Sequence, residues 1–183
     1  MTRAYSLYGR RSFLFFAAAA GTTLVVRPDT SSAAESSTRI LALHSRWSDE
    51  NFVGPFFERG TYLTGALAEI DYLFRDRHNN DVHRIDVRLL DLLHAFKQRT
   101  GYRSSFELVC GYRSASTNRM LRKKSRRVAK ESRHIKGQAA DVRFYGMSVD
   151  EAHRIALAMQ AGGVGYYPKQ DFIHLDVGPV RSW

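Results

Sequence analysis

The order of the periodic segments limits the fold of this chain more than any other feature. Apolar residues recur at three- and four-residue spacing over 61–77 and again between Asp86 and Gly101, which predicts two amphipathic helices. Short apolar runs that read as strands follow at 106–110, 139–144, 164–167 and 172–177. The helices precede and interrupt the strands without regular alternation. This order predicts an α+β domain with a small, mainly antiparallel sheet and packed helices.

Three further segments complete the expected domain. Residues 39–43 alternate in polarity and read as a first strand. Ser116 is expected to begin a strongly basic helix that runs to about residue 127. Ser148 and Glu151 have the spacing of a capping box, which predicts a helix that ends before Gly162.

The first 34 residues have the pattern of an export signal. Arg10 and Arg11 directly precede a weakly apolar stretch from Phe13 to Val26, and 32–34 offer a small-residue cleavage site. Such a stretch is too short to cross a bilayer comfortably, and the paired arginines indicate the twin-arginine route. We therefore expect residues 1–34 to be the signal and 35–183 to be a periplasmic domain. Only an uncleaved signal would attach that domain to the membrane.

The charge and the cysteine content narrow the range of partners. Removal of residues 1–34 takes away four arginines and one aspartate, which lowers the net charge from +10 to +7. A basic surface often indicates nucleic acid, but export removes that partner and favours anionic wall polymers or lipid headgroups. Cys110 is the only cysteine, which rules out a disulfide within the chain and a cysteine-rich zinc site. We expect a monomer.

Three residues in the second half of the chain are of the types that bind a catalytic metal. His134 lies in a glycine-marked stretch, while Asp141 and His174 lie in apolar strands, where an unpaired carboxylate would be costly to bury. Imidazole and carboxylate ligands with one open position for water are typical of zinc hydrolases. Each residue alone would more often be a hydrogen-bonded core residue. The three together predict a Zn²⁺ site.

The stretch Ser132-x-His134-x-x-Gly137-x-Ala139-x-Asp141 resembles the signature of a group of zinc peptidases. That group includes lysostaphin-type enzymes, D-Ala-D-Ala carboxypeptidases and sonic hedgehog. A narrower resemblance, to the murein endopeptidase K family, extends over nearly all of 35–183. It is carried by the signature and by Phe74-Arg75-Asp76, Ile85-Asp86, Gly111-Tyr112-Arg113-Ser114, 161–168 and 174–183.

The resemblance implies a fold like that of hedgehog and the D-Ala-D-Ala carboxypeptidases, with zinc held by His134, Asp141 and His174. It implies that metal-activated water hydrolyses amide bonds in the peptide cross-links of peptidoglycan. It also implies that Arg113 points at the substrate carbonyl, where a fixed guanidinium stabilises the oxyanion that forms.

The general base is less closely determined. Many relatives place an acidic residue three positions before the last histidine, and Asp171 occupies that position here. Asp176 follows His174 by two residues, so strand alternation puts both on one face. Asp176 is therefore the rival base, or a partner that orients a ligand histidine. We favour Asp171.

Several alternatives stay open at this point. The expected partner is the stem peptide of peptidoglycan, but the chain is also compatible with a carboxypeptidase that removes terminal D-Ala. A zinc-stabilised domain that binds peptidoglycan without cutting it is the third reading. The sequence does not decide between 4-3 and 3-3 cross-links. A basic run lies just before the signature and consists of Arg119, Arg122, Lys123, Lys124, Arg126, Arg127 and Lys130. It either lines the cleft and attracts stem-peptide carboxylates or forms a solvated helix face.

Overall fold

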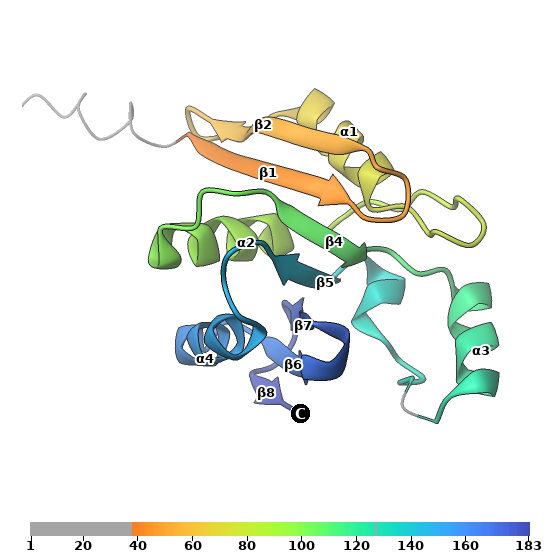
Figure 1. Ribbon diagram of the computed structural model, residues 1–183. Coiled ribbons are helices and arrows are strands. Elements are labelled where there is room, and N and C mark those ends of the chain that lie inside the picture. The colour runs from red at the N-terminus through yellow and green to blue at the C-terminus, as the bar shows by residue number, and fades with distance from the viewer. Residues whose placement is uncertain (1–37, 127) are drawn as a thin grey trace, which may run out of the picture. The chain divides into compact units, whose positions relative to one another are not determined.

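The computed structural model describes residues 38–126 and 128–183, coloured in Figure 1. The predicted signal, residues 1–34, and its twin-arginine pair lie outside these residues. Within the described part, no helix is long and apolar enough to cross a membrane. The helices are α1 (Thr64–Leu73), α2 (Val87–Thr100), α3 (Ala115–Lys124) and α4 (Val149–Met159), with short 3-10 helices η2 (Arg133–Lys136) and η3 (Pro168–Gln170).

One eight-stranded sheet is formed by the described residues, in the order β3-β2-β1-β4-β5-β7-β6-β8. Its strands are β1 (Arg39–Ser45), β2 (Asn51–Glu58), β3 (Thr61–Tyr62), β4 (Phe106–Cys110), β5 (Ala139–Phe144), β6 (Gly163–Tyr167), β7 (Phe172–Asp176) and β8 (Arg181–Ser182). The pairs β1–β4 and β6–β8 are parallel, and the other pairs are antiparallel. The predicted α+β class with a mainly antiparallel sheet is confirmed.

Two predicted helices have different bounds. The helix expected over 61–77 is wrong at both ends, because Thr61–Tyr62 pair with β2 as β3 and the helix ends at Leu73. Beyond it, the Asp76 carboxylate accepts the backbone N–H of His78, which turns the chain away from helix geometry. The basic helix begins one residue earlier than expected and ends at Lys124, since Ser114 is the N-cap and accepts the backbone N–H of Thr117.

The remaining helix ends follow the capping signals of the sequence. Asp86 caps α2 by accepting the backbone N–H of Arg88, and Gly101 ends that helix with a left-handed φ of 65°. Ser148 caps α4 by accepting the backbone N–H of Glu151. These three predictions are confirmed because each depends on chemistry within a few residues.

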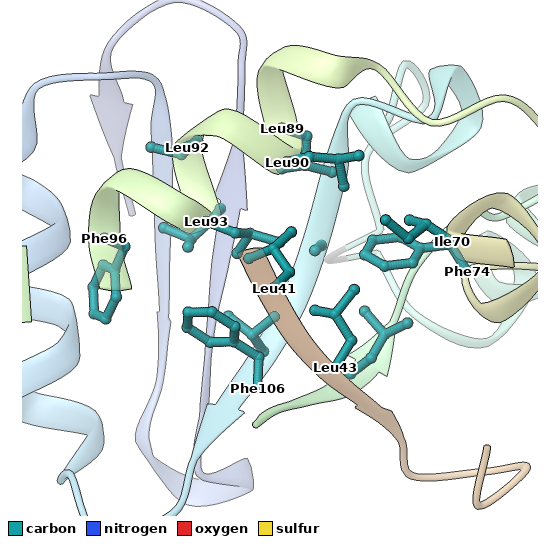
Figure 2. Packing of buried hydrophobic residues seen from close by; sticks show 14 of the residues in the cluster. Leu41, Leu43, Ile70, Phe74, Leu89, Leu90, Leu92, Leu93, Phe96 and Phe106 are labelled. Atoms are coloured by element: carbon teal, nitrogen blue, oxygen red, sulfur yellow. The ribbon is translucent and has the colours of Figure 1, made fainter. Parts of the chain in front are cut away.

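The hydrophobic core lies between the sheet and helices α1, α2 and α4. Figure 2 shows Leu41 and Leu43 of β1 meeting a row of side chains from α2, with Ile70 and Phe74 beside them. The α2 row consists of Leu89, Leu90, Leu92, Leu93 and Phe96, which are all buried. Each such side chain contributes roughly 1.5–3 kcal/mol when fully buried. The core therefore fixes one face of the sheet and leaves the other face for polar residues.

Candidate metal centre

The central strands β5 and β7 present two polar side chains next to each other. In the antiparallel register Asp141 lies directly opposite His174. The neighbours of His174 in β7, Ile173 and Leu175, belong to the core, so alternation turns His174 to the opposite face of the sheet. Pairing and alternation together bring the carboxylate and the imidazole into contact on that face.

His134 reaches the same place from the short helix η2. Ser132 caps this turn by accepting the backbone N–H of His134, and Gly137 ends it with a φ of 63°. A Cβ atom on Gly137 would lie 2.4 Å from the carbonyl oxygen of Arg84, so glycine is required for both conformation and space. The Gly137 carbonyl also accepts the backbone N–H of Asp86. The loop that carries His134 is thereby fixed to the start of α2.

Three ligand atoms converge. Nε2 of His134 lies 3.1 Å from Nδ1 of His174 and 3.3 Å from Oδ1 of Asp141, and the last two atoms are 2.9 Å apart. A tetrahedral zinc ion with bonds of about 2.0–2.1 Å would hold its ligand atoms about 3.3 Å apart. The three side chains are buried. Their spacing and chemistry fit a divalent metal with three protein ligands.

The outward-facing nitrogen of each imidazole has an acceptor of its own. Nδ1 of His134 lies 2.7 Å from the carbonyl oxygen of Gly111, and Nε2 of His174 lies 3.0 Å from Oδ2 of Asp176. When the protons are on Nδ1 of His134 and Nε2 of His174, the lone pairs of the other two ring nitrogens face Asp141. Acceptors of this kind set the tautomer and orientation of metal-binding histidines.

Charges in the cluster stabilise one another. Burial raises the pKa of Asp141, but the neighbouring imidazoles of His134 and His174 outweigh burial and hold this pKa far below its ordinary value. Burial lowers the pKa of His134, and the Asp141 carboxylate outweighs burial in turn and raises it. The cluster therefore holds a proton in the absence of metal, which metal binding would displace.

Asp176 is fully buried and accepts several hydrogen bonds. Besides His174, its oxygens accept from the backbone N–H groups of Gly163 and Gly178 and from the guanidinium of Arg181. Burial raises its pKa, and these donors outweigh burial and lower it. Both oxygens are directed at protein donors, an arrangement that suits a residue that positions His174.

Asp171, the other acidic candidate, is placed differently. It follows η3 in a left-handed conformation with a φ of 56°, and its side chain is 61% exposed. Its carboxylate lies 3.1 Å from Nε of Arg143, which stands two residues after Asp141 on β5. Asp171 is therefore solvated and paired with Arg143, whose side chain lies on the same face of β5 as Asp141 by strand alternation.

Cys110 is a residue of the cluster that sequence reasoning missed. It pairs with Asp141 across β4 and β5 after a bulge between Leu108 and Cys110, and its Sγ lies within 4.8 Å of the ligand atoms of His134 and Asp141. Its position at the end of a strand, directly before Gly111-Tyr112-Arg113-Ser114, was the available signal. Cys110, His134 and Asp141 also have the chemistry of a metal site. His174 contacts His134 and Asp141 at 3.1 and 2.9 Å, and its other ring nitrogen lies 3.0 Å from Asp176.

Arg113 is held beside the cluster. Its backbone N–H donates to the carbonyl of His134, and its guanidinium donates to Asn118 and contacts Sγ of Cys110. Among the described residues, no carboxylate lies within ion-pair distance of this guanidinium. Arg113 therefore presents a fixed cation with hydrogen-bonding capacity beside the three ligand atoms.

Two cavities flank the cluster and share Arg113, Asp141 and Phe172. The first, which we call the cationic lobe, measures about 140 Å³ and extends to Trp47, Arg75, Arg77 and His78. The second, the aromatic lobe, measures about 280 Å³ and includes His134, His174, Tyr167 and Trp183. The cluster thus has room on both sides.

The basic run does not line either lobe in the part of the chain described. The side chains of Arg119, Arg122, Lys123, Lys124, Arg126 and Lys130 are exposed. The aromatic lobe is lined instead by residues that lie between or directly after the members of the run, and one of them, Glu131, is acidic; they are Val128, Ala129, Glu131, Ser132 and Arg133. Of the two readings of this run, the exposed helix face is the one that the geometry favours.

Two imidazoles and a carboxylate lie in mutual contact on a sheet face between two cavities. Such a set on an α+β scaffold is of the kind that binds the metal ion of mononuclear metallohydrolases. A family model described as peptidoglycan L,D-endopeptidase MepK matches residues 32–183, and the chain belongs to that family. The resemblance to the murein endopeptidase K family that the sequence motifs predicted is confirmed.

Curated relatives agree with the family model. Peptidoglycan L,D-endopeptidase MepK of Escherichia coli strain K12 is 39% identical over 165 residues, which cover 90% of this chain and 91% of that protein. A probable peptidoglycan L,D-endopeptidase MepK of Haemophilus influenzae is 42% identical over 146 residues, which cover 79% of this chain and 78% of the relative. No solved structure is significantly similar, so the hedgehog- or carboxypeptidase-like fold stays a prediction.

Proposed function

We propose that this chain is an exported, zinc-dependent endopeptidase that hydrolyses amide bonds in the peptide cross-links of peptidoglycan. The observation that carries the proposal is the convergence of His134 Nε2, Asp141 Oδ1 and His174 Nδ1 within 3.3 Å of one another. These three residues would hold the metal. Bound zinc supplies Lewis acidity and lowers the pKa of a coordinated water towards about 7.

The surrounding residues prepare the ligands. Asp176 and the Gly111 carbonyl accept the outward N–H groups of the two imidazoles, which directs the inward nitrogens at the place where the metal would bind. The pairing of β5 with β7 holds Asp141 against His174. The chain thus orients the ligand set before any substrate binds.

Arg113 would stabilise the charge that develops on the substrate carbonyl oxygen. Its guanidinium lies at the junction of the two lobes and has no carboxylate partner among the residues that the structure covers. A scissile amide that spans the junction would place its carbonyl near this cation. A preorganised donor at such a position is typically worth about 10²–10³ in kcat.

We assign the base to Asp171 and the positioning of His174 to Asp176. A proton acceptor needs access to the attacking water, and Asp171 is solvated whereas Asp176 is fully buried among donors. Arg143 pairs with the Asp171 carboxylate, 3.1 Å from its Nε, and so holds that carboxylate in place. The assignment predicts that loss of Asp171 slows turnover without releasing the metal.

The names of the relatives include the words L,D-endopeptidase, which describe a bond between an L- and a D-centre. Of the two common cross-links, the 3-3 link joins an L-centre carbonyl to a D-centre amine, whereas the 4-3 link joins two D-centres. We therefore propose the 3-3 link as the substrate. Such a substrate lies outside the cytoplasm, in keeping with the twin-arginine-type signal predicted over residues 1–34.

The two lobes favour an endopeptidase over a carboxypeptidase. An endopeptidase must accommodate residues on both sides of the scissile bond, and cavities flank the cluster on both sides. Incubation of the purified protein with cross-linked and uncross-linked muropeptides, followed by mass analysis, separates the readings. Cleavage of the dimer to monomers supports our proposal. Release of D-Ala alone indicates a carboxypeptidase, and binding without products indicates a recognition domain.

A further inference from the structure

The cationic lobe contains one arginine that neither the fold nor the metal cluster uses. Arg75 is neutralised by Glu50, with 2.6 Å between Nη1 and Oε2, and its guanidinium packs over the rings of Trp47 and Tyr72. Arg77 also lines the lobe, and its side chain is exposed. Among the described residues, its side chain makes one hydrogen bond, from Nε to Nε2 of His78 at 3.4 Å. Within residues 38–126 and 128–183, no carboxylate lies at ion-pair distance from Arg77.

Asp76, the acidic residue next to Arg77, already accepts hydrogen bonds from the backbone. The oxygens of Asp76 accept the backbone N–H groups of His78 and Ser114, at 2.9 and 2.8 Å, and its side chain is buried. A carboxylate that is satisfied by backbone donors does not compete strongly for the neighbouring guanidinium. Arg77 is therefore available for an anion in the lobe.

The loop that carries Arg77 is anchored to the segment that carries Arg113. The backbone N–H of Tyr112 donates to the carbonyl of Phe74, and Asp76 accepts the backbone N–H of Ser114. A Cβ atom on Gly111 would lie 2.6 Å from the carbonyl oxygen of Phe74, so the two segments are in direct backbone contact. These contacts fix the position of Arg77 relative to Arg113 and the metal cluster.

The proposed substrates share one anionic group beside the bond to be cut. In both the 4-3 and the 3-3 cross-link, the scissile nitrogen belongs to the D-centre of a diamino acid, and that carbon also bears a free carboxylate. The lobe begins at Arg113 and Asp141 and extends to Arg77, and about 140 Å³ is of the order of one amino-acid side chain. A carboxylate there would meet a guanidinium in a site with apolar walls at Trp47, Leu121 and Phe172.

We propose that the cationic lobe binds the accepting diamino acid of the cross-link and that Arg77 pairs with the free carboxylate next to the scissile nitrogen. This inference rests on the proposed function. Arg77 is then a specificity-determining residue, and the enzyme distinguishes a free carboxylate from an amidated one at this position.

The test compares two muropeptide dimers that differ only in amidation of that carboxylate. For the unaltered protein, we expect amidation to lower kcat/KM about tenfold, as for loss of a partly exposed charge-assisted hydrogen bond. Arg77→Gln should cut the free dimer as slowly as the unaltered protein cuts the amidated dimer. Amidation should then cause no further loss of kcat/KM in this variant. Arg103→Gln is the matched control, because Arg103 is exposed and lines neither lobe. It should retain the full discrimination.

Equal discrimination by Arg77→Gln and the unaltered protein overturns the inference while leaving the proposed function intact. If neither dimer is cut, the proposed function fails, and binding decides the inference. In that case, the uncross-linked stem peptide with a free diaminopimelate carboxylate is titrated into the protein by calorimetry. Weaker binding by Arg77→Gln than by Arg103→Gln supports the carboxylate site, and equal binding overturns it.

Discussion

Replacement of Asp176 by asparagine separates the positioning of the metal ligand from proton transfer. The carboxylate presents Oδ1 to Gly163, Gly178 and Arg181, and Oδ2 to His174 and Arg181. An amide supplies one acceptor in place of two. Since Oδ1 faces more donors than Oδ2, the amide nitrogen is expected to take the position that faces Nε2 of His174.

The consequence for the metal site follows from the tautomer. An NH₂ group that faces Nε2 favours the imidazole with its proton on Nδ1, the atom that lies 2.9 Å from Asp141 and faces the cluster. A protonated Nδ1 cannot bind a metal. Loss of such an orienting partner typically lowers metal affinity ten- to a hundredfold, or by about 1.4–2.7 kcal/mol. The fold should survive, since the replacement keeps the size of the side chain.

The assay is a competition for zinc between the protein and a chromogenic chelator. Asp171→Asn is the matched control, because its carboxylate is exposed and pairs with Arg143 rather than with a ligand histidine. We expect weaker zinc binding in Asp176→Asn and unchanged binding with slower turnover in Asp171→Asn. Unchanged zinc affinity in Asp176→Asn, together with lost activity, would refute the reasoning and make Asp176 the base.

Three further predictions follow from the loop, the cap and the basic run. Gly137→Ala should lower the free energy of unfolding, measured in urea, by well over about 2 kcal/mol. A left-handed alanine alone costs about 1–2 kcal/mol, and its Cβ would also clash with a backbone oxygen. The control is Gly146→Ala, which should show the conformational cost only, because Gly146 has a φ of 80° and open space around it. Arg88 holds the pKa of Asp86 at about 2, below the unfolded value near 3.9, so the contribution of this pair to stability is complete above about pH 5 and is lost as the pH falls through 2 towards about 1. Asp86→Asn should therefore lower the free energy of unfolding by about 0.5–1 kcal/mol at pH 7 and by much less at pH 2. Equal loss at both pH values would be the contrary result. Neutralising the exposed cations Lys123, Lys124 and Arg126 should weaken salt-dependent binding to whole peptidoglycan and leave cleavage of a small soluble dimer unchanged. Slower cleavage of that dimer would indicate that these residues line the cleft.

Elements with local signals could be predicted from the sequence. The bounds of β5 and the caps Asp86 and Ser148 depend on apolar runs and capping side chains within a few residues. Strand β2 was missed because Gly54 and Pro55 interrupt its pattern. Proline is tolerated there because β3 pairs only with the last two residues of β2 and leaves the rest of that edge free.

The candidate site shows the same division between local and distant information. His134, Asp141 and His174 were identified by residue type and context, and the structure brings all three together. The position of Cys110 beside them depends on a bulge in β4, and the anchoring of Arg77 depends on contacts between residues 74–76 and 111–114. Irregular pairings of this kind arise from tertiary packing and leave no periodic trace in the sequence.

Measurement of metal content tests the central claim most directly. The protein should bind one zinc ion per chain after exhaustive dialysis, as measured by elemental analysis, and His134→Ala and His174→Ala should each lose it. Cys110→Ser should retain the ion, because we assign the ligands to the two histidines and Asp141. Full zinc occupancy in His174→Ala, or loss of zinc in Cys110→Ser with His174 intact, would contradict the metal centre described above.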